Sequence, residues 1–146
     1  MDKNDRRYGQ TADEFILRDL RQMEQAPAYH DWVYSLVQPH LGNRILEIGS
    51  GIGSFTRRML TNADLVVGIE PNNYCASVLQ ENVTDEHFIF HNKRIEEVDT
   101  AELRQHALNT IICVNVLEHI EHDREVIEKF LTCSTRMAWW CSFCPP

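Results

Sequence analysis

The chain has 146 residues and a formal net charge of −8, and 43% of its residues are hydrophobic. This length suits one compact domain, and the composition is that of a globular protein. The acidic balance argues against a nucleic-acid-binding surface built on general basicity, and no apolar run is long enough to span a bilayer.

The N-terminal segment, residues 1–10, is polar, and we expect a flexible tail without the hydrophobic core of a signal peptide. We therefore place the protein in the cytoplasm and expect residues 11–146 to form a single domain. The five cysteines are odd in number and three of them crowd the C-terminus, a distribution that is not typical of a secreted disulfide framework.

Two helices are predicted at the start of the domain. Thr11 can cap the first helix, and Pro27 suits the first turn of the second. The apolar residues that recur at helical spacing are Phe15, Ile16, Leu20 and Met23 in the first helix, and Trp32, Val33, Leu36 and Val37 in the second. Gly42 is expected to end the second helix in the left-handed conformation.

Short apolar strands then alternate with helices. The predicted strands are 44–48, 64–69, 88–91 and 110–114, and the predicted helices are 54–61, 73–80, 101–107 and 123–131. Strands that are apolar on both faces and are separated by helices indicate a parallel sheet covered on both sides. The predicted fold class is therefore α/β, a Rossmann-like doubly wound and mostly parallel sheet with N-terminal helices, incomplete at the C-terminus.

A glycine-rich turn, ILEIGSGIGSF (residues 45–55), follows the first predicted strand directly. Ligands of such folds bind beyond the carboxyl ends of the strands, and glycines there permit positive φ and close backbone approach. The dinucleotide pattern G-x-G-x-x-G fits poorly, because Ser54 takes the place of the last glycine. Glu47, just before the glycines, would also repel a pyrophosphate, so a nicotinamide dehydrogenase is the weaker alternative.

A second acid, Glu70, ends the next strand in the stretch VVGIE. An acid at this position typically accepts hydrogen bonds from ribose hydroxyls. Together, Glu47 and Glu70 indicate a ligand that combines a ribose with a cationic group.

Three motifs in order, ILEIGSGIG, VVGIEP and VNVLEHIEHD, resemble the class I S-adenosylmethionine-dependent methyltransferases, in particular their small-molecule branch. The resemblance covers roughly residues 28–129. It implies an enzyme that transfers a methyl group from S-adenosylmethionine (SAM) to a small-molecule acceptor, with no nucleic-acid or membrane partner. The acceptor, and whether O, N or C is methylated, stay open.

The resemblance also implies roles for individual residues. Glu47 would face the methionine amino group of the cofactor, and Glu70 would hold the ribose hydroxyls. Asn115 would offer its backbone carbonyl to the amino group. The loop residues whose backbone would pass the methionine moiety and ribose are Gly49, Ser50, Gly51 and Gly53, and the residues expected near the adenine are Pro71 and Asn72.

The sequence departs from the family pattern after the third strand, where Arg94 stands in place of an aspartate that would accept from the adenine amine. Arginine cannot accept a hydrogen bond. Adenine recognition would then depend on the backbone N–H of Ile95 or on Glu96. At the start of the fourth strand, Asn109 replaces another aspartate.

Several residues admit both a functional and a structural interpretation. His119 and Glu118 are weak catalytic candidates that could instead cap or pack locally. Tyr29 and Trp32 either line the mouth of the cofactor site or, as is commoner for aromatics at helical spacing, lie in the core. Scattered histidines show no metal-ligand pattern, and no metal is expected.

The C-terminal stretch TCSTRMAWWCSFCPP, residues 132–146, does not match the family. We hypothesise that it arises from a frameshift, in which case the spacing of Cys141 and Cys144 is accidental and not a zinc motif. A truncated, non-catalytic SAM-binding domain is therefore the second functional hypothesis. Unless MAWWCSF pairs with it, the fourth strand is expected to be an exposed edge.

Overall fold

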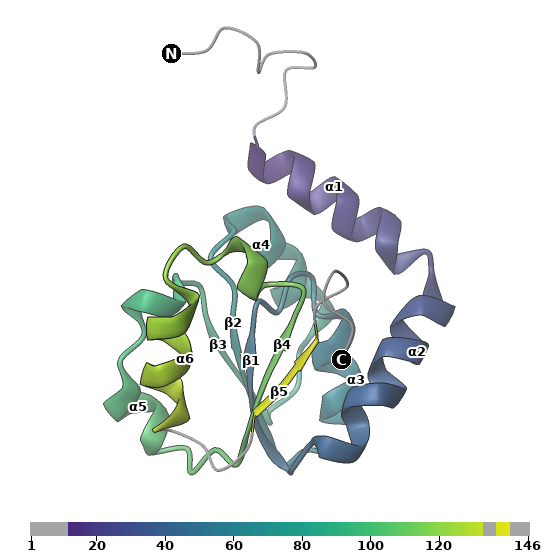
Figure 1. Cartoon of the computed structure of the whole chain (residues 1–146). Coiled ribbons are helices and arrows are strands. Elements are labelled where there is room, and N and C mark those ends of the chain that lie inside the picture. Colours follow the sequence, from purple (N-terminus) through teal and green to yellow (C-terminus); the bar gives the residue numbers. More distant parts are fainter. Residues whose placement is uncertain (1–11, 133–136, 141–146) are drawn as a thin grey trace, which may run out of the picture.

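The computed structural model describes residues 12–132 and 137–140. Figure 1 shows a central sheet with helices on both of its sides. All strands are parallel and follow the order β3-β2-β1-β4-β5. Their bounds are β1 Arg44–Ile48, β2 Leu65–Ile69, β3 Phe88–His91, β4 Thr110–Val114 and β5 Met137–Trp140. The predicted doubly wound α/β fold is confirmed.

The helices also follow the predicted order, with small shifts at their ends. They are α1 Ala12–Glu24, α2 Pro27–Val37, α3 Ser54–Leu60, α4 Asn73–Asn82, α5 Thr100–Arg104 and α6 Asp123–Leu131. Short 3-10 helices lie at Gln38–His40 (η1), Ile95–Glu97 (η2) and Leu117–His119 (η3). No helix in the described ranges is both long and apolar enough to cross a membrane.

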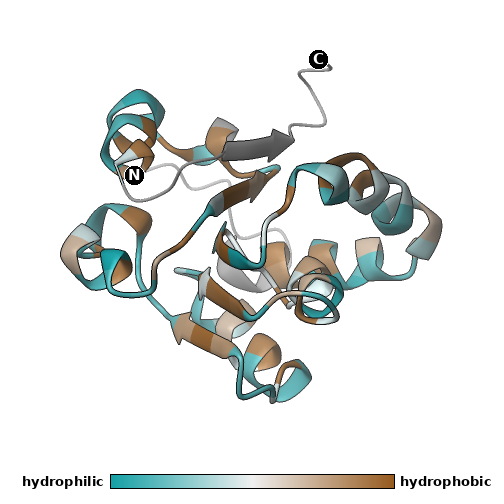
Figure 2. Ribbon diagram, turned by 90° about the horizontal axis from the view of Figure 1, so that it is seen from below, coloured by the Kyte–Doolittle hydropathy of each residue, from teal (hydrophilic) through white to brown (hydrophobic). Residues whose placement is uncertain are grey.

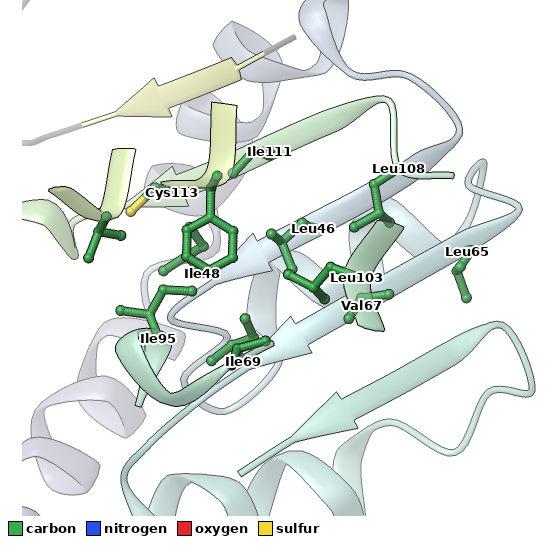
Figure 3. Packing of buried hydrophobic residues seen from close by; sticks show 13 residues of the cluster. Leu46, Ile48, Leu65, Val67, Ile69, Ile95, Leu103, Leu108, Ile111 and Cys113 are labelled. Atoms are coloured by element: carbon green, nitrogen blue, oxygen red, sulfur yellow. The ribbon is translucent and has the colours of Figure 1, made fainter. Parts of the chain in front are cut away.

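The core has two layers, one on each face of the sheet. Ile45, Val66 and Ile112 pack with residues of α2 and α3 on one face. Their strand neighbours Leu46 and Ile111 pack with α5 and α6 on the other (Figure 3). Side chains alternate between the faces of a strand, so a strand covered on both sides is apolar throughout. Figure 2 shows this arrangement, with brown strands between helices that carry much of the teal.

The tail contributes a fifth strand. β5 pairs in parallel with β4, from Ile111 opposite Met137 to Val114 opposite Trp140. The stated exception to an exposed fourth-strand edge therefore holds, because MAWW pairs with the hydrogen-bonding groups on that side of β4. Thr11 and residues 133–136 and 141–146, including Cys141 and Cys144, lie outside the described residues, as does most of the stretch assigned to a frameshift.

Gly42 does not end α2 in the left-handed conformation, and that prediction is wrong. The α-helix ends at Val37 and continues into η1, and the left-handed glycines of the described chain are Gly49, Gly51 and Gly53. A Cβ on Gly42 would lie 2.2 Å from Oδ1 of Asn109. The position thus requires a glycine for close approach rather than for its φ.

The two N-terminal helices bury only part of their apolar residues. Val33 and Val37 of α2 are buried, with Val37 packed on the sheet, whereas Trp32 is 53% exposed. The core interpretation of Trp32 is therefore wrong. A single helix face meets the sheet, and Trp32 lies one residue away from Val33, about 100° around the helix.

Candidate cofactor-binding site

The glycine loop lies between β1 and α3 and is tied to the end of β2. The backbone N–H groups of Gly49 and Ser50 both donate to the carbonyl oxygen of Ile69, at 2.8 and 3.0 Å. All three loop glycines are left-handed, with φ values of 78° at Gly49, 54° at Gly51 and 89° at Gly53. The prediction that these positions use positive φ is confirmed.

Two of the glycines are also required by close packing. A Cβ on Gly49 would lie 2.2 Å from Cγ2 of Val116, and a Cβ on Gly53 would lie 2.8 Å from both Leu79 and Val83. At Gly51 the nearest atom is Cδ1 of Leu20, at 3.4 Å, which is an ordinary contact. The loop is therefore held between the segment after β4, helix α4 and helix α1.

Glu47 projects from β1 toward α3 beneath this loop. Its side chain is buried, and Oε2 accepts a 2.5 Å hydrogen bond from the hydroxyl of Thr56. The pKa of Glu47 is raised to about 7, mainly by burial and in smaller part by the charge of Glu70, while the Thr56 hydrogen bond opposes the rise. Without a bound cation, this carboxylate is thus ready to take up a proton near neutral pH.

Glu70 lies directly after β2 and is also buried. Its carboxylate accepts one hydrogen bond from the N–H of Gly51, at 2.8 Å, and one from the N–H of Asn72, at 2.9 Å. Burial raises its pKa, and these two hydrogen bonds oppose the rise. Glu70 therefore joins the end of β2 to the middle of the glycine loop.

Asn115 follows β4 in the left-handed region, with φ 54°, an uncommon conformation for a residue other than glycine. Its side-chain amide donates to the hydroxyl of Tyr29 on α2, at 3.1 Å. The structure thus brings Tyr29 to the carboxyl end of β4, beside one of the predicted site residues, and Tyr29 is only half-buried.

The residues predicted near the adenine are spread around the ends of β2 and β3. Pro71 is exposed, and Asn72 caps α4 by accepting from the N–H groups of Tyr74 and Cys75. Ile95 is buried at the start of η2. The guanidinium of Arg94 is exposed and lies 3.6 Å from the Glu96 carboxylate, so these two side chains interact with each other.

Three contributors to this region were missed in the sequence. Thr56 bonds Glu47, Glu24 of α1 contacts the start of α3, and the Asn92 amide donates to the carbonyl of Glu70 at 2.8 Å. Thr56 could have been found from the sequence, because it is a polar residue in the first turn of the helix that follows the loop. Asn92 and Glu24 carried no local signal, because their partners are distant in sequence.

The weaker candidates lie in the segment after β4. His119 is exposed at the end of η3, and Glu118 belongs to the same short helix. Among the residues that the structure describes, no group of three or more His, Cys, Asp or Glu side chains is arranged to hold a metal ion.

Comparison with known proteins agrees with this geometry. Residues 16–138 match the family model of a methyltransferase domain. An uncharacterised methyltransferase of Bacillus cereus is 27% identical over 120 residues, which cover 81% of this chain and 53% of that protein. The chain thus spans about half the length of the curated relatives it matches.

Solved structures show the same fold. One is the N-methyltransferase NodS from Bradyrhizobium japonicum WM9 in complex with S-adenosyl-L-homocysteine, with a TM-score of 0.62, 18% identity, and coverage of 74% of this chain and 56% of that one. Another is magnesium protoporphyrin IX methyltransferase from Synechocystis PCC 6803 with bound SAM, with a TM-score of 0.58, 18% identity, and coverage of 90% and 64%. With the family model matching most of its length, the chain belongs to the methyltransferase domain family.

Proposed function

We propose that the chain is the cofactor-binding part of a SAM-dependent methyltransferase that acts on a small-molecule acceptor. The observation that carries this proposal is the pair of buried carboxylates, Glu47 and Glu70, beside a loop of left-handed glycines at the ends of two adjacent parallel strands. The family match and the solved relatives that hold SAM or S-adenosylhomocysteine support the same cofactor.

The charge of the site fits a cationic ligand. Burial raises the pKa of both Glu47 and Glu70, which means that each negative charge lacks full compensation from the protein itself. A nearby positive charge favours the ionised form of a carboxylate. SAM, which carries both a sulfonium and an ammonium group, supplies such charge and an activated methyl group when bound.

The chain's own residues would bind and orient this ligand. Each carboxylate oxygen of Glu70 accepts one backbone hydrogen bond and has a second acceptor position, which we assign to the ribose hydroxyls. The carbonyl of Asn115 and the N–H of Ile95 remain proposed contacts of the amino group and the adenine. Most of the rate enhancement would then come from alignment of the acceptor with the methyl group.

The methyl acceptor is proposed only as a class, a small molecule. One of the two solved relatives is an N-methyltransferase and the other is a porphyrin methyltransferase, so they point to no common acceptor. Exposed His119, close in sequence to Asn115, is the side chain that we would test first for acceptor contact.

Titration calorimetry with S-adenosylhomocysteine tests cofactor binding. We expect binding by the wild-type chain, loss of about tenfold or more in affinity for Glu70→Gln, and no change for Glu86→Gln, whose side chain is 91% exposed. Hydrogen bonds to charged groups are worth about 1.5–3 kcal/mol, which sets the expected loss. No heat and no thermal shift at millimolar ligand would end the proposal.

Binding of SAM without turnover is the alternative proposal. Transfer of a labelled methyl group to a panel of small-molecule acceptors separates the two. Transfer supports the enzyme, whereas tight S-adenosylhomocysteine binding with no transfer to any acceptor supports the second function.

A further inference from the structure

We propose that β3 is a pairing edge for a second copy of this chain, so that two copies join their sheets through antiparallel β3 strands about a twofold axis. The proposal concerns an interaction surface and goes beyond the cofactor site. It is carried by the position of the strand, the direction of its backbone groups, its side chains and the charges at its two ends.

The strand lies at the edge of the sheet. Within the described chain, β3 pairs with β2 alone. Figure 1 shows it as the outermost strand on the side opposite β5. Every side chain of β3 is only partly buried, and the side chains of Glu86 and His87, just before it, are 91% and 56% exposed. An edge strand that is open in this way is a template for pairing with another strand.

The backbone groups of β3 alternate in direction. The carbonyl of His87 accepts from the N–H of Val66 at 2.9 Å, and the carbonyl of His91 accepts at 3.2 Å from the N–H directly after β2. In a parallel ladder, the residue between two such residues turns its backbone groups to the other side. The N–H and carbonyl of Phe90 therefore point away from β2.

The outward groups fit a twofold partner. Among the described residues, nothing pairs with the backbone groups of Phe90, the carbonyl of Phe88 or the N–H of Asn92. With Phe90 opposite Phe90 of the other copy, these two residues exchange hydrogen bonds, and each Asn92 N–H meets the other copy's Phe88 carbonyl. The N–H of Phe88 is not needed, because it donates to the carbonyl of Asp85 at 3.1 Å.

The side chains of β3 favour pairing as well. Edge strands are commonly protected by proline, by charged residues or by a bulge. The strand reads FIFH and contains no proline and no Asp, Glu, Lys or Arg. Phe88 and Phe90 stack on one face, with ring centroids 6.0 Å apart. The twofold register continues this aromatic row into the other copy, and cross-strand aromatic pairs stabilise antiparallel sheets.

The charges at the two ends of the strand select an antiparallel copy as the partner. Asp85 and Glu86 precede β3, and Lys93 and Arg94 follow it. Antiparallel pairing brings the acidic end of each copy to the basic end of the other, whereas parallel pairing would place like charges together. Arg94 lies 3.6 Å from Glu96. Lys93 forms no ion pair within the described chain, and we assign it to the acidic end of the other copy.

The first test is sedimentation velocity over a range of protein concentrations. A short strand buries little area, so we expect a weak dimer whose mass fraction rises with concentration. Phe90→Pro removes the outward N–H without touching the β2 ladder, and edge strands tolerate proline there. It should weaken dimerisation by about tenfold or more, since the hydrogen bonds that both Phe90 N–H groups donate are lost. Phe90→Val, which retains the N–H, should weaken it less.

Disulfide cross-linking tests the register in an otherwise intact strand. The register places residue 90 opposite its own copy, at a Cα separation of about 5.5 Å, which a disulfide can span. Residue 88 would lie roughly 14 Å along the strand from its copy, which is too far. On copper phenanthroline oxidation, Phe90→Cys should therefore form covalent dimers much faster than Phe88→Cys or the wild-type chain, which report the background from native cysteines.

A charge reversal tests the ends of the strand. Lys93→Glu should weaken dimerisation by about two- to tenfold at low salt and less at high salt, because exposed charges are screened. Arg124→Glu changes the net charge equally, on the exposed surface of α6, and is the matched control. It should leave dimerisation unchanged.

The outcomes are independent of the cofactor. A wild-type chain that stays monomeric at every concentration refutes the pairing and leaves the proposed function standing. Dimerisation that Phe90→Pro leaves unchanged, or equally fast cross-linking in Phe88→Cys, shows that another surface or register forms the dimer. An equal effect of Lys93→Glu and Arg124→Glu refutes the charge assignment. Failure to bind S-adenosylhomocysteine would end the proposed function and leave the pairing untouched.

Discussion

The Thr56 hydroxyl donates a 2.5 Å hydrogen bond to Oε2 of Glu47, and both side chains are buried beneath the glycine loop. This contact joins the central strand β1 to the helix that follows the loop. The Glu47 carboxylate is poorly solvated there and has the Thr56 hydroxyl as a hydrogen-bond donor. In the absence of a cation, its ionisation therefore destabilises the folded chain.

The stability of the ligand-free protein should therefore fall as the pH rises. The pKa of Glu47 is about 7 in the folded chain and near 4.5 in the unfolded chain. The folded state binds the extra proton between these values, so the free energy of unfolding decreases as pH rises through 7, by on the order of 3 kcal/mol from this group. Denaturant titrations across this range measure the slope.

Glu47→Gln should flatten much of that slope and make the chain more stable than wild type at about pH 8, because the amide is never charged. Glu86→Gln, at an exposed carboxylate, is the control and should leave the slope unchanged. A wild-type slope that survives intact in Glu47→Gln would show that other groups cause it.

Thr56→Val should destabilise the chain more at high pH than at low pH. Valine keeps the shape of threonine and removes the donor, so the ionised carboxylate of Glu47 loses about 1.5–3 kcal/mol and the protonated one about 1 kcal/mol. Thr56→Ser, which retains a hydroxyl, is the matched control. Equal losses at both ends of the pH range would mean that the hydrogen bond does not favour the charged form.

Gly49→Ala should cost clearly more stability than Gly51→Ala. Both positions are left-handed, which costs a residue other than glycine about 1–2 kcal/mol. Only at Gly49 would the new Cβ also collide with a side chain, that of Val116. Thermal unfolding of the two variants measures the difference in stability. Adding Val116→Ala should restore part of the lost stability in Gly49→Ala but none in Gly51→Ala.

Gly42→Ala should destabilise the chain through contact with Asn109 rather than through φ. Overpacking costs about 1–3 kcal/mol. The double variant with Asn109→Ala should therefore lose less than the two single variants added together, as measured by a double-mutant cycle. Strict additivity would contradict the close-approach explanation.

Much of the fold was readable from local pattern. The strands at 44–48, 88–91 and 110–114 were predicted with their observed bounds, because each is a short, mostly apolar run. Gly49, Gly51 and Gly53 were recognisable because a left-handed turn requires glycine for a local, steric reason. Gly42 was wrongly predicted to be left-handed. A glycine is needed there because of the close approach of Asn109, which is distant in sequence and leaves no local signal.

By itself, the sequence determined the order of elements, the parallel sheet and the position of Glu47 and Glu70 beside the glycine loop, since each follows from short-range periodicity and spacing. The tertiary structure alone decided that MAWW pairs as a fifth strand, that Trp32 is exposed, and that Glu24 fastens α1 to α3. Those features depend on contacts between segments that are distant along the chain, and no local pattern encodes which distant groups will meet.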